Sequence, residues 1–232
     1  MNIASMHQEF KILTDKIDSL NFPELIPEEI DVILNIAIER FVNQRAYGNN
    51  PRREGLEETQ KRFDDLLTLI TGTTITTFGT NPLLKPNEYS VALPSDYWHT
   101  INEEASINYI DCNGITQTKR IPVIPITHDR YNKIIRDPFN KPNSDKIIRL
   151  GLGGNITLIT GQVTLNAYYL RYIRKPIQVQ YGSVYPNPIS DINCDLPEST
   201  HKEIVNHARS IALGVIESPN INIADKEIIT QE

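Results

Sequence analysis

Cysteine is scarce in this chain, with only Cys112 and Cys194 among 232 residues. Two cysteines far apart, with no partner pattern, exclude a disulfide framework and a Cys-rich metal site. We expect both to be small thiols that are buried or half-buried. The five histidines also lack any metal-ligand spacing, so the sequence predicts no metal and no other cofactor.

Long apolar runs are missing too, since no stretch approaches the ~18 residues that a membrane-spanning helix needs. Residues 1–10 lack the basic flank and apolar core of a signal peptide. Lys and Arg together number 23 against 29 Asp and Glu, which gives a formal net charge of −6. A dedicated nucleic-acid binder neutralises phosphates with basic side chains, so this balance disfavours that class. We expect synthesis in the cytoplasm and no membrane partner.

Catalytic motifs are absent from the sequence as well. Residues 151–154 superficially resemble a phosphate loop, but no helix is expected after them, and we interpret them as a hairpin turn. No nucleophile motif of the Gly-x-Ser-x-Gly type and no Cys/His cluster is present. The basic residues Arg171, Arg174 and Lys175 lie beside three tyrosines and could stack bases. A strand with a charged rim is the favoured interpretation, and the sequence predicts a protein that is not an enzyme.

The first third of the chain has helical periodicity. Apolar residues at spacings of three and four predict a helix over about residues 2–19, which packs along a narrow seam. A second helix is predicted from Pro27 to about Ala46, and a third from Gly55 to about Ile70. The i,i+4 pairs Glu57–Lys61 and Glu58–Arg62 indicate a solvated face on the third helix.

The second predicted helix is apolar around most of its circumference, apart from a polar stripe that comprises Asp31, Asn35, Glu39 and Asn43. A helix of this kind must be covered on more than one side. One explanation, the favoured one, is a central position in a three-helix packing. The other is that a neighbouring subunit covers part of it, which would place Ile33, Ile36 and Phe41 at a protein–protein interface.

From about residue 73 the apolar period changes from 3.6 to 2, which predicts strands. Asn113-Gly114 is a strong hairpin signal, and Pro122 and Pro125 indicate an edge strand or a bulge in the return strand. A short helical turn is expected over residues 129–135. Further strands complete an antiparallel meander, and the last strand, apolar on both faces, is expected to be central. A proline-containing linker over residues 175–193 should be extended.

The C-terminal segment predicts one amphipathic helix, with Ile204, Ala208, Ile211 and Val215 on a single face. We expect this face to pack onto the N-terminal helices. The resulting fold class is α+β: a helical bundle joined by the C-terminal helix, enclosing an antiparallel β-sandwich-like or meander module. The expected organisation is a helical region at 1–72, a β module at 73–193, the joining helix at 194–217 and a flexible tail at 218–232.

A proline-stiffened loop over residues 137–142 is the second candidate interface. Phe139 within it is too apolar to lie in water without a reason. We therefore expect the loop to contact a neighbouring protein in an assembly. Its candidate interface residues are Asp137, Pro138, Phe139, Asn140, Lys141 and Pro142.

Four stretches in this order resemble the head-to-tail connector (adaptor or neck ring) proteins of short-tailed bacteriophages, and most of all the ring proteins of crAss-like phages. The stretches are residues 93–99, 137–142, 169–176 and 194–198 with the helix to residue 217. The likeness spans roughly residues 25–217. It implies a virion structural protein that forms a ring, with twelve copies to match a portal. It also implies contacts with the portal or an adjacent ring and with tail proteins, and a channel through which double-stranded DNA passes without specific binding.

Two other readings remain open at this point. One is a virion β-sandwich module that binds a receptor or a glycan, which the exposed aromatic loop permits and the helical third disfavours. The other is a phage hydrolase, which the missing acid pair or triad disfavours.

Overall fold

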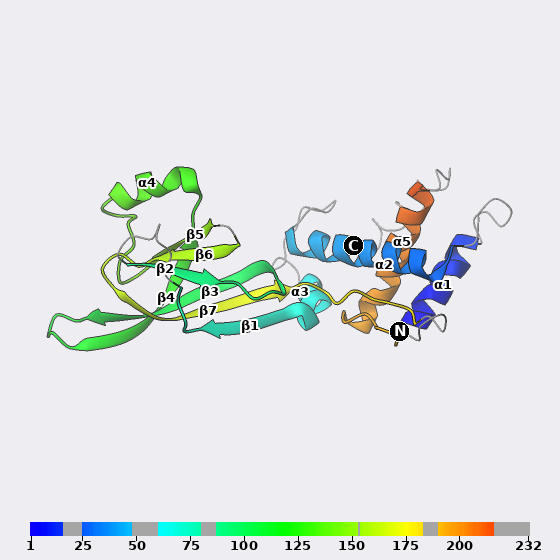
Figure 1. Cartoon of the computed structure of the whole chain (residues 1–232), viewed down its shortest axis with the longest axis horizontal. Coiled ribbons are helices and arrows are strands. Elements are labelled where there is room, and N and C mark those ends of the chain that lie inside the picture. The colour runs from blue at the N-terminus through cyan, green and yellow to red at the C-terminus, as the bar shows by residue number, and fades with distance from the viewer. Residues whose placement is uncertain (16–24, 48–59, 80–86, 153, 183–189, 216–232) are drawn as a thin grey trace. The chain divides into compact units, whose positions relative to one another are not determined.

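The computed structural model describes residues 1–15, 25–47, 60–79, 87–152, 154–182 and 190–215 (Figure 1). The chain forms two compact units, and the first of them combines both ends of the sequence, Met1–Leu69 and Lys175–Glu232. The second unit is the middle of the chain, Ile70–Arg174. Helices at both ends and a sheet between them make an α+β fold, which confirms the predicted class.

The first unit is helical. Its elements are α1 (Ile3–Asp15), α2 (Pro27–Tyr47), α3 (Gln60–Leu66), the 3₁₀ turns η1 (Leu67–Leu69) and η2 (Glu198–Thr200), and α5 (His201–Val215). Helix α5 packs against both α1 and α2, so the C-terminal helix does return to the N-terminal helices as predicted. The buried side chains at these contacts include Met6, Phe10, Leu34, Ile38 and Ile204.

Two helix predictions need correction. Ile70 is the first residue of a strand rather than the end of the third helix, because it pairs with Ile173 in the sheet ladder. Leu67, which belongs to the apolar residues of the predicted third helix, is exposed in the 3₁₀ turn that follows α3. On α5, Val215 is 75% exposed, although its spacing places it on the same face as the buried Ile204 and Ala208. It is the last residue of the helix, and the buried part of that face ends before it.

Other helix predictions fall partly outside the described residues, including the C-terminal half of the first seam, the start of the third helix and the tail. Of the two predicted surface pairs on the third helix, the glutamates lie outside that part. Lys61 is exposed as expected, but Arg62 is buried. The predicted solvated face is therefore wrong at Arg62, whose guanidinium donates to the Gln44 carbonyl oxygen across 3.4 Å.

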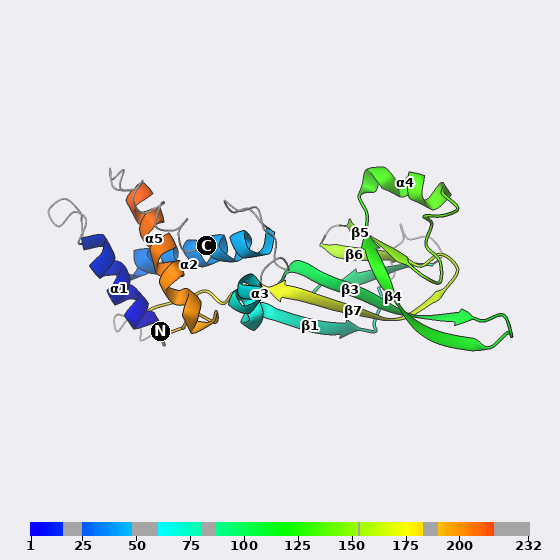
Figure 2. The same ribbon diagram turned by 180° about the vertical axis from the view of Figure 1, so that it is seen from behind.

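The second unit is a curled seven-stranded sheet with one helix, as far as the structure describes it (Figures 1 and 2). Its elements are β1 (Ile70–Ile75), β2 (Glu88–Ala92), β3 (Tyr97–Ile110), β4 (Thr116–Pro125), α4 (His128–Arg136), β5 (Ile147–Leu152), β6 (Asn155–Ile159) and β7 (Thr164–Arg174). The strand order is β1-β7-β3-β4-β5-β6-β2.

One pair of strands departs from the predicted antiparallel meander. Strands β4 and β5 pair in parallel over Val123–Pro125 and Ile147–Arg149, and α4 with the following loop forms the crossover between them. Parallel neighbouring strands need such a long connection. The helical turn predicted over residues 129–135 lies within it. Strand β4 pairs with β3 up to Pro122 and with β5 from Val123. The proline thus marks the place where β4 changes partner.

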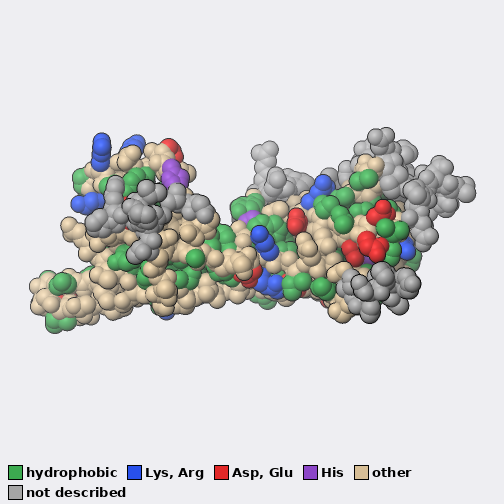
Figure 3. All heavy atoms as spheres, viewed as in Figure 1, with side chains coloured by type: hydrophobic (Ala, Val, Ile, Leu, Met, Phe, Trp, Pro, Cys, Tyr) green, Lys and Arg blue, Asp and Glu red, His purple; other side chains and the backbone are tan. Residues whose placement is uncertain are grey.

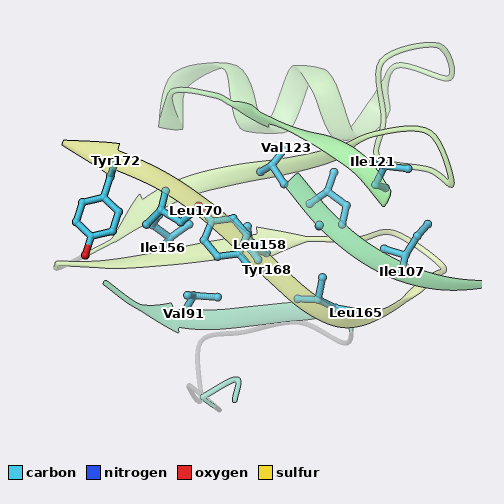
Figure 4. Packing of buried hydrophobic residues seen from close by; sticks show 12 residues of the cluster. Val91, Ile107, Ile121, Val123, Ile156, Leu158, Leu165, Tyr168, Leu170 and Tyr172 are labelled. Carbon is cyan, nitrogen blue, oxygen red and sulfur yellow. The ribbon is translucent and has the colours of Figure 1, made fainter. Parts of the chain in front are cut away.

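Because β4 changes partner, the two halves of the sheet curl over a common core (Figure 4). Tyr168 and Leu170 of β7 point into this core together with Ile107, Val123, Ile156 and Leu158 from three other strands. Strand β7 lies between β1 and β3, so its predicted central position is confirmed.

A buried polar cluster connects the two halves of the curl. The Tyr168 hydroxyl donates to Glu103 Oε1 across 2.9 Å, and Arg149 Nε lies 2.6 Å from Glu103 Oε2. Burial raises the pKa of Glu103 and outweighs the opposing effect of the Arg149 charge. Since Glu103 lies on β3, Tyr168 on β7 and Arg149 on β5, the cluster joins one half of the sheet to the other.

Candidate assembly surfaces

Helix α2 is covered mainly by its own chain. Phe41 is fully buried, with the His207 ring edge-on to it and the Arg45 guanidinium 4.8 Å from its centroid. Phe41 therefore already has partners within the helical unit, unlike the interface residue that we expected from the sequence. Phe41 packs at the contact between α2 and α5. This agrees with the first explanation given above, a central position of the second helix in a three-helix packing.

The first half of the polar stripe of α2, Asp31 and Asn35, binds the extended linker, whereas Glu39 is exposed. The Asn35 side chain donates to the Val179 carbonyl oxygen and accepts from the Val179 N–H, at 3.0 and 2.8 Å. One turn earlier, the carboxylate of Asp31 accepts from the Tyr181 N–H at 3.0 Å and lies 2.7 Å from His7 Nε2. Backbone groups need partners when they leave water, and these side chains supply them.

An exposed apolar stripe remains on α2. Ile36 is 40% exposed, Val32 is more exposed still, and Ile33 beside them is half-buried. Two of the three interface candidates on this helix thus reach the surface of the helical unit. Val32 belongs to the same stripe, and its spacing of four from Ile36 was the signal that could have identified it.

Arg45 connects three helices of the helical unit, a role that the apolar periodicity of the sequence did not predict. Its guanidinium contacts the carboxylates of Asp65 on α3 and Glu203 on α5, and the Asp65 oxygen is 3.0 Å from Nε. Burial raises the pKa of Asp65, while the Arg45 charge opposes that rise. One buried cation thus joins three helices.

The loop at residues 137–142 is rigid and presents its aromatic ring to solvent. Phe139 is 86% exposed. Asp137 Oδ1 accepts from the Phe139 N–H at 3.0 Å, Asp137 Oδ2 accepts from the Asn140 side chain at 2.6 Å, and these bonds lower the pKa of Asp137. Lys146 Nζ donates to the Phe139 carbonyl oxygen at 3.0 Å. The hydrogen bonds fix the backbone around an exposed phenyl ring.

The loop is also anchored at its far end, where Pro142 is buried. A Cβ on Gly161 would lie only 2.7 Å from the Pro142 carbonyl oxygen, and Gly161 has a positive φ of 70°. Glycine is the residue that tolerates both conditions. Of the six loop candidates, Pro142 is therefore a buried anchor, whereas Pro138, Phe139, Asn140 and Lys141 are exposed and Asp137 is half-buried.

Helix α4 precedes this loop and lies over one half of the sheet (Figures 1 and 2). None of its residues is buried, and Lys and Arg side chains gather over it in Figure 3. Beneath it is an open hollow of about 650 Å³, with Ile124, Ile134 and Ile148 on its apolar side and Lys133 and Lys146 on its charged side. Helix, hollow and loop together form one protruding, partly apolar surface.

The β3–β4 hairpin, predicted from Asn113-Gly114, is present in the sheet unit. It extends past the other strands as an arm in both views of the ribbon (Figures 1 and 2). Asp111 Oδ1 accepts from the N–H groups of Asn113 and Ile115 at 2.8 and 2.9 Å, which lowers the pKa of Asp111 and fixes the tip. Ile110 at the tip is 72% exposed, and Ile115 is exposed as well.

The basic and aromatic cluster around β7 is not a base-stacking surface. Tyr168 and Tyr172 are buried in the core, and the Tyr172 hydroxyl donates to Asp96 at 2.9 Å. Burial and this hydrogen bond raise the pKa of Tyr172 to about 12. Tyr169 is partly exposed, but the Arg120 guanidinium lies over its ring at 4.0 Å. The interpretation as a strand with a charged rim fits this geometry.

Both cysteines are free thiols. Cys194 is half-buried, and burial raises its pKa to about 11, whereas Cys112 is exposed at the hairpin tip. The expectation that both would be covered is therefore wrong for Cys112. Among the described residues, no three His, Cys, Asp or Glu side chains are grouped so that they could hold a metal ion. No helix in the described ranges has the length and apolar character to cross a membrane.

Apolar side chains presented on a loop, a helix and a hairpin arm are typical of a protein that assembles with other proteins. The comparisons specify which kind. The family described as "Phage tail ring protein 3/4" matches residues 1–221. The chain therefore belongs to the phage tail ring protein 3/4 family, a component of the virion that assembles as an oligomeric ring.

A curated relative agrees with this family. The chain is 24% identical over 169 residues to "Ring protein 3" of Bacteroides phage crAss001, which covers 69% of this chain and 70% of the relative. The resemblance to crAss-like ring proteins is thus confirmed. The family match begins at residue 1, so it includes the first helix, which lay outside the span of residues 25–217 suggested by the sequence motifs.

Proposed function

We propose that this chain forms a ring in the neck of the virion, connects the portal or head to the tail, surrounds the DNA channel, and catalyses no reaction. The observation that carries the proposal is the match to a tail ring family over residues 1–221. About twelve copies would match a portal. The partners would be the portal or an adjacent ring on one side and tail proteins on the other.

The exposed apolar groups support contacts by both units of the subunit. Phe139 is held outward by hydrogen bonds to its own loop, so its exposure is built into the fold. The stripe of Val32 and Ile36 lies in the helical unit, whereas Phe139 belongs to the sheet unit. Exposed apolar groups on separate parts of a soluble chain commonly mark protein interfaces. In the proposed ring, Ile33, Ile36 and the 137–142 loop serve as protein–protein contacts.

Charge supports passage of DNA without specific binding. Each copy has a formal net charge of −6, so about twelve copies carry about −72. An acidic ring repels the phosphate backbone and keeps the duplex from adhering to the wall. Basic side chains gather over α4 (Figure 3), which is the part of the sheet unit best suited to an acidic protein partner.

The decisive experiment is an image of the intact particle in which this chain is located by fitting its two units separately. The proposal expects a closed ring between portal and tail that surrounds density for DNA. It is overturned if the chain lies elsewhere in the virion, or if it does not encircle the channel.

A variant tests the loop within the same system. Phe139→Ser should leave the melting temperature of the purified chain unchanged, because the Phe139 side chain is 86% exposed and makes little contact with its own unit. The variant should nevertheless reduce the yield of tailed particles. Val215→Ser is the matched control, since it removes another exposed apolar side chain from a different element. Equal particle yields for both variants and the wild type would show that Phe139 makes no contact needed for assembly.

A further inference from the structure

One half of the curled sheet, in the order β1-β7-β3-β4, has an open edge on each side. Its three pairings are all antiparallel, so the strand direction alternates across it and β1 and β4 run in opposite directions. Among the described residues, no strand pairs with the outer edge of β1. Strand β4 pairs with β5 only from Val123 onward, so its stretch from Thr116 to Ile121 has β3 as its one neighbour in the described structure.

The β1 edge lacks the protection that isolated proteins use against unwanted strand pairing, whereas the β4 edge carries Lys119 and Arg120. Such edges are normally blunted by charges, prolines or bulges. Strand β1 reads Ile-Thr-Gly-Thr-Thr-Ile, and no charged residue stands between Asp65 and Lys85 in the sequence. By contrast, β2 at the other end of the whole sheet is partly covered, since Gly79 bridges to Ser90. An unprotected edge of this kind is a template for another strand.

We propose that the outer edge of β1 in one copy pairs with the outer edge of the β4 arm in the next copy. This assignment rests on the ring proposed above and names the lateral contact that closes it. Because the direction alternates over an even number of strands, β4 of one copy and β1 of its neighbour meet antiparallel. Two different edges of the same chain make a head-to-tail contact, which is the type that generates rings.

The electrostatics of this contact suit an acidic subunit. Strand β4 carries Lys119 and Arg120 and no acidic residue, while β1 carries no charge at all. Bringing these edges together therefore adds no repulsion between acidic groups at the point of contact. Pairing would also carry the arm tip, with Ile110 and Ile115, onto the neighbouring copy and cover apolar surface that its own unit leaves in water (Figure 3).

The faces of the two strands determine which side chains would meet. Thr74 pairs with Tyr169, whose ring holds Arg120, so Thr74 and Arg120 lie on the same face of the sheet. Side chains alternate along a strand. Thr116 and Thr118 therefore share the Arg120 face, whereas Gln117 points to the opposite one. In a continuous sheet, Thr74 of one copy can approach Thr118 of the next but not Gln117.

Engineered cysteines test this face rule in virions that carry the variant chain. Cys112→Ser first removes the exposed natural thiol. Same-face variants then combine Gly72→Cys or Thr74→Cys with a second cysteine on β4. To cover the possible registers, the second cysteine replaces Thr116, Thr118 or Arg120 in turn. A Cβ at Gly72 meets its nearest atoms at 3.7 Å, so that substitution fits.

Opposite-face variants provide the control, with Thr74→Cys combined with Gln117→Cys, whose Cβ atoms cannot reach disulfide distance across one ladder. After mild oxidation, at least one same-face variant should give a ladder of linked chains on a non-reducing gel. Single-cysteine and opposite-face variants should give none.

The outcomes separate this inference from the ring itself. If the variant chain is present in virions and imaged as a ring, but no same-face pair forms a ladder, the β1–β4 contact is wrong and the ring stands. Equal ladders from same-face and opposite-face pairs also overturn the contact, because they indicate nonspecific linkage. If imaging shows no ring at all, the proposed function and this contact fail together.

Discussion

The packing of α5 against α1 and α2 gives the most direct stability test, through the variant Ile204→Ala. Ile204 is completely buried at this contact. The substitution removes three carbon groups, each worth about 0.8 kcal/mol when buried, so the lost transfer free energy is about 2.4 kcal/mol. The cavity left behind adds to this, and measured Ile→Ala costs at buried sites lie at about 2–5 kcal/mol.

A free energy loss of about 3 kcal/mol should lower the melting temperature by roughly 6–12 °C for a chain of this size. Far-UV circular dichroism during heating measures it, and the helical signal should report the helical unit in particular. Val215→Ala is the control on the same helix, because Val215 is 75% exposed and should change stability by at most about 0.5 kcal/mol. If both variants melt within a degree of the wild type, α5 does not pack as described.

Three further predictions concern other contacts. Arg45→Met should cost about 3–5 kcal/mol, because it leaves Asp65 and Glu203 close together without their buried cation, whereas Lys61→Met at the exposed end of the same network should cost less than about 1 kcal/mol. Burial already raises the pKa of Asp65 above its unfolded value, and removal of Arg45 raises it further, so the native variant takes up protons as the pH falls. The stability deficit of Arg45→Met in urea titrations should therefore be smaller at about pH 5 than at about pH 7. Gly161→Ala should destabilise the chain by more than about 1 kcal/mol, the order of magnitude for a strained positive-φ site, because its Cβ would meet the Pro142 carbonyl oxygen. Gly114→Ala is the control and should cost less, because the space around its Cβ is open. The purified chain alone should sediment as a monomer or weak oligomer at low salt and associate more at high salt, because salt screens the repulsion between acidic subunits over about 8 Å at physiological strength. A stable closed ring at micromolar concentration in low salt would contradict this expectation.

The sequence was most informative where one period dominates a segment. Helix α2 begins at Pro27 and ends within a residue of the predicted end, because proline at its start and the Gly-Asn-Asn-Pro stretch after it are local signals. The Asn-Gly hairpin and the central position of β7 were equally predictable, since one depends on a turn dipeptide and the other on apolar residues on both faces.

The errors arose where distant segments decide the environment. Asp31 and Asn35 were identified only as part of a polar stripe, yet they bind the backbone of a linker that follows the whole sheet unit in sequence. Arg62, expected on a solvated face, is buried, because its partner is the backbone of α2. No local periodicity distinguishes a polar side chain that faces water from one that satisfies a buried backbone group.

The dependence on distant segments also explains which of the candidate interface residues could be identified from the sequence. Phe139 could be identified from composition alone, since an aromatic ring between two prolines is conspicuous in any sequence. Phe41 could not be distinguished from Ile36, because both belong to a helix that is apolar around its circumference, and only the fold shows that α5 covers one and leaves the other exposed. The open edge of β1 was beyond reach, because an edge is a property of strand order, whereas Pro122 and Pro125 had indicated an edge strand or a bulge in β4.

Strand order also gives a physical reason why an acidic chain can assemble laterally at all. A contact through acidic faces would oppose association at every interface, and the loss would grow with the number of copies. Pairing between strands gains backbone hydrogen bonds whose strength does not depend on side-chain charge, at edges that are neutral on β1 and basic on β4. The acidic surplus can then lie on the remaining surface, where it keeps the free subunit soluble and repels DNA. In this arrangement, mutating Lys119 and Arg120 together to Glu should weaken the association that the wild type shows at high salt, as sedimentation of the purified variant would measure. A double variant that associates as strongly as the wild type at high salt would show that the β4 edge does not take part in the contact.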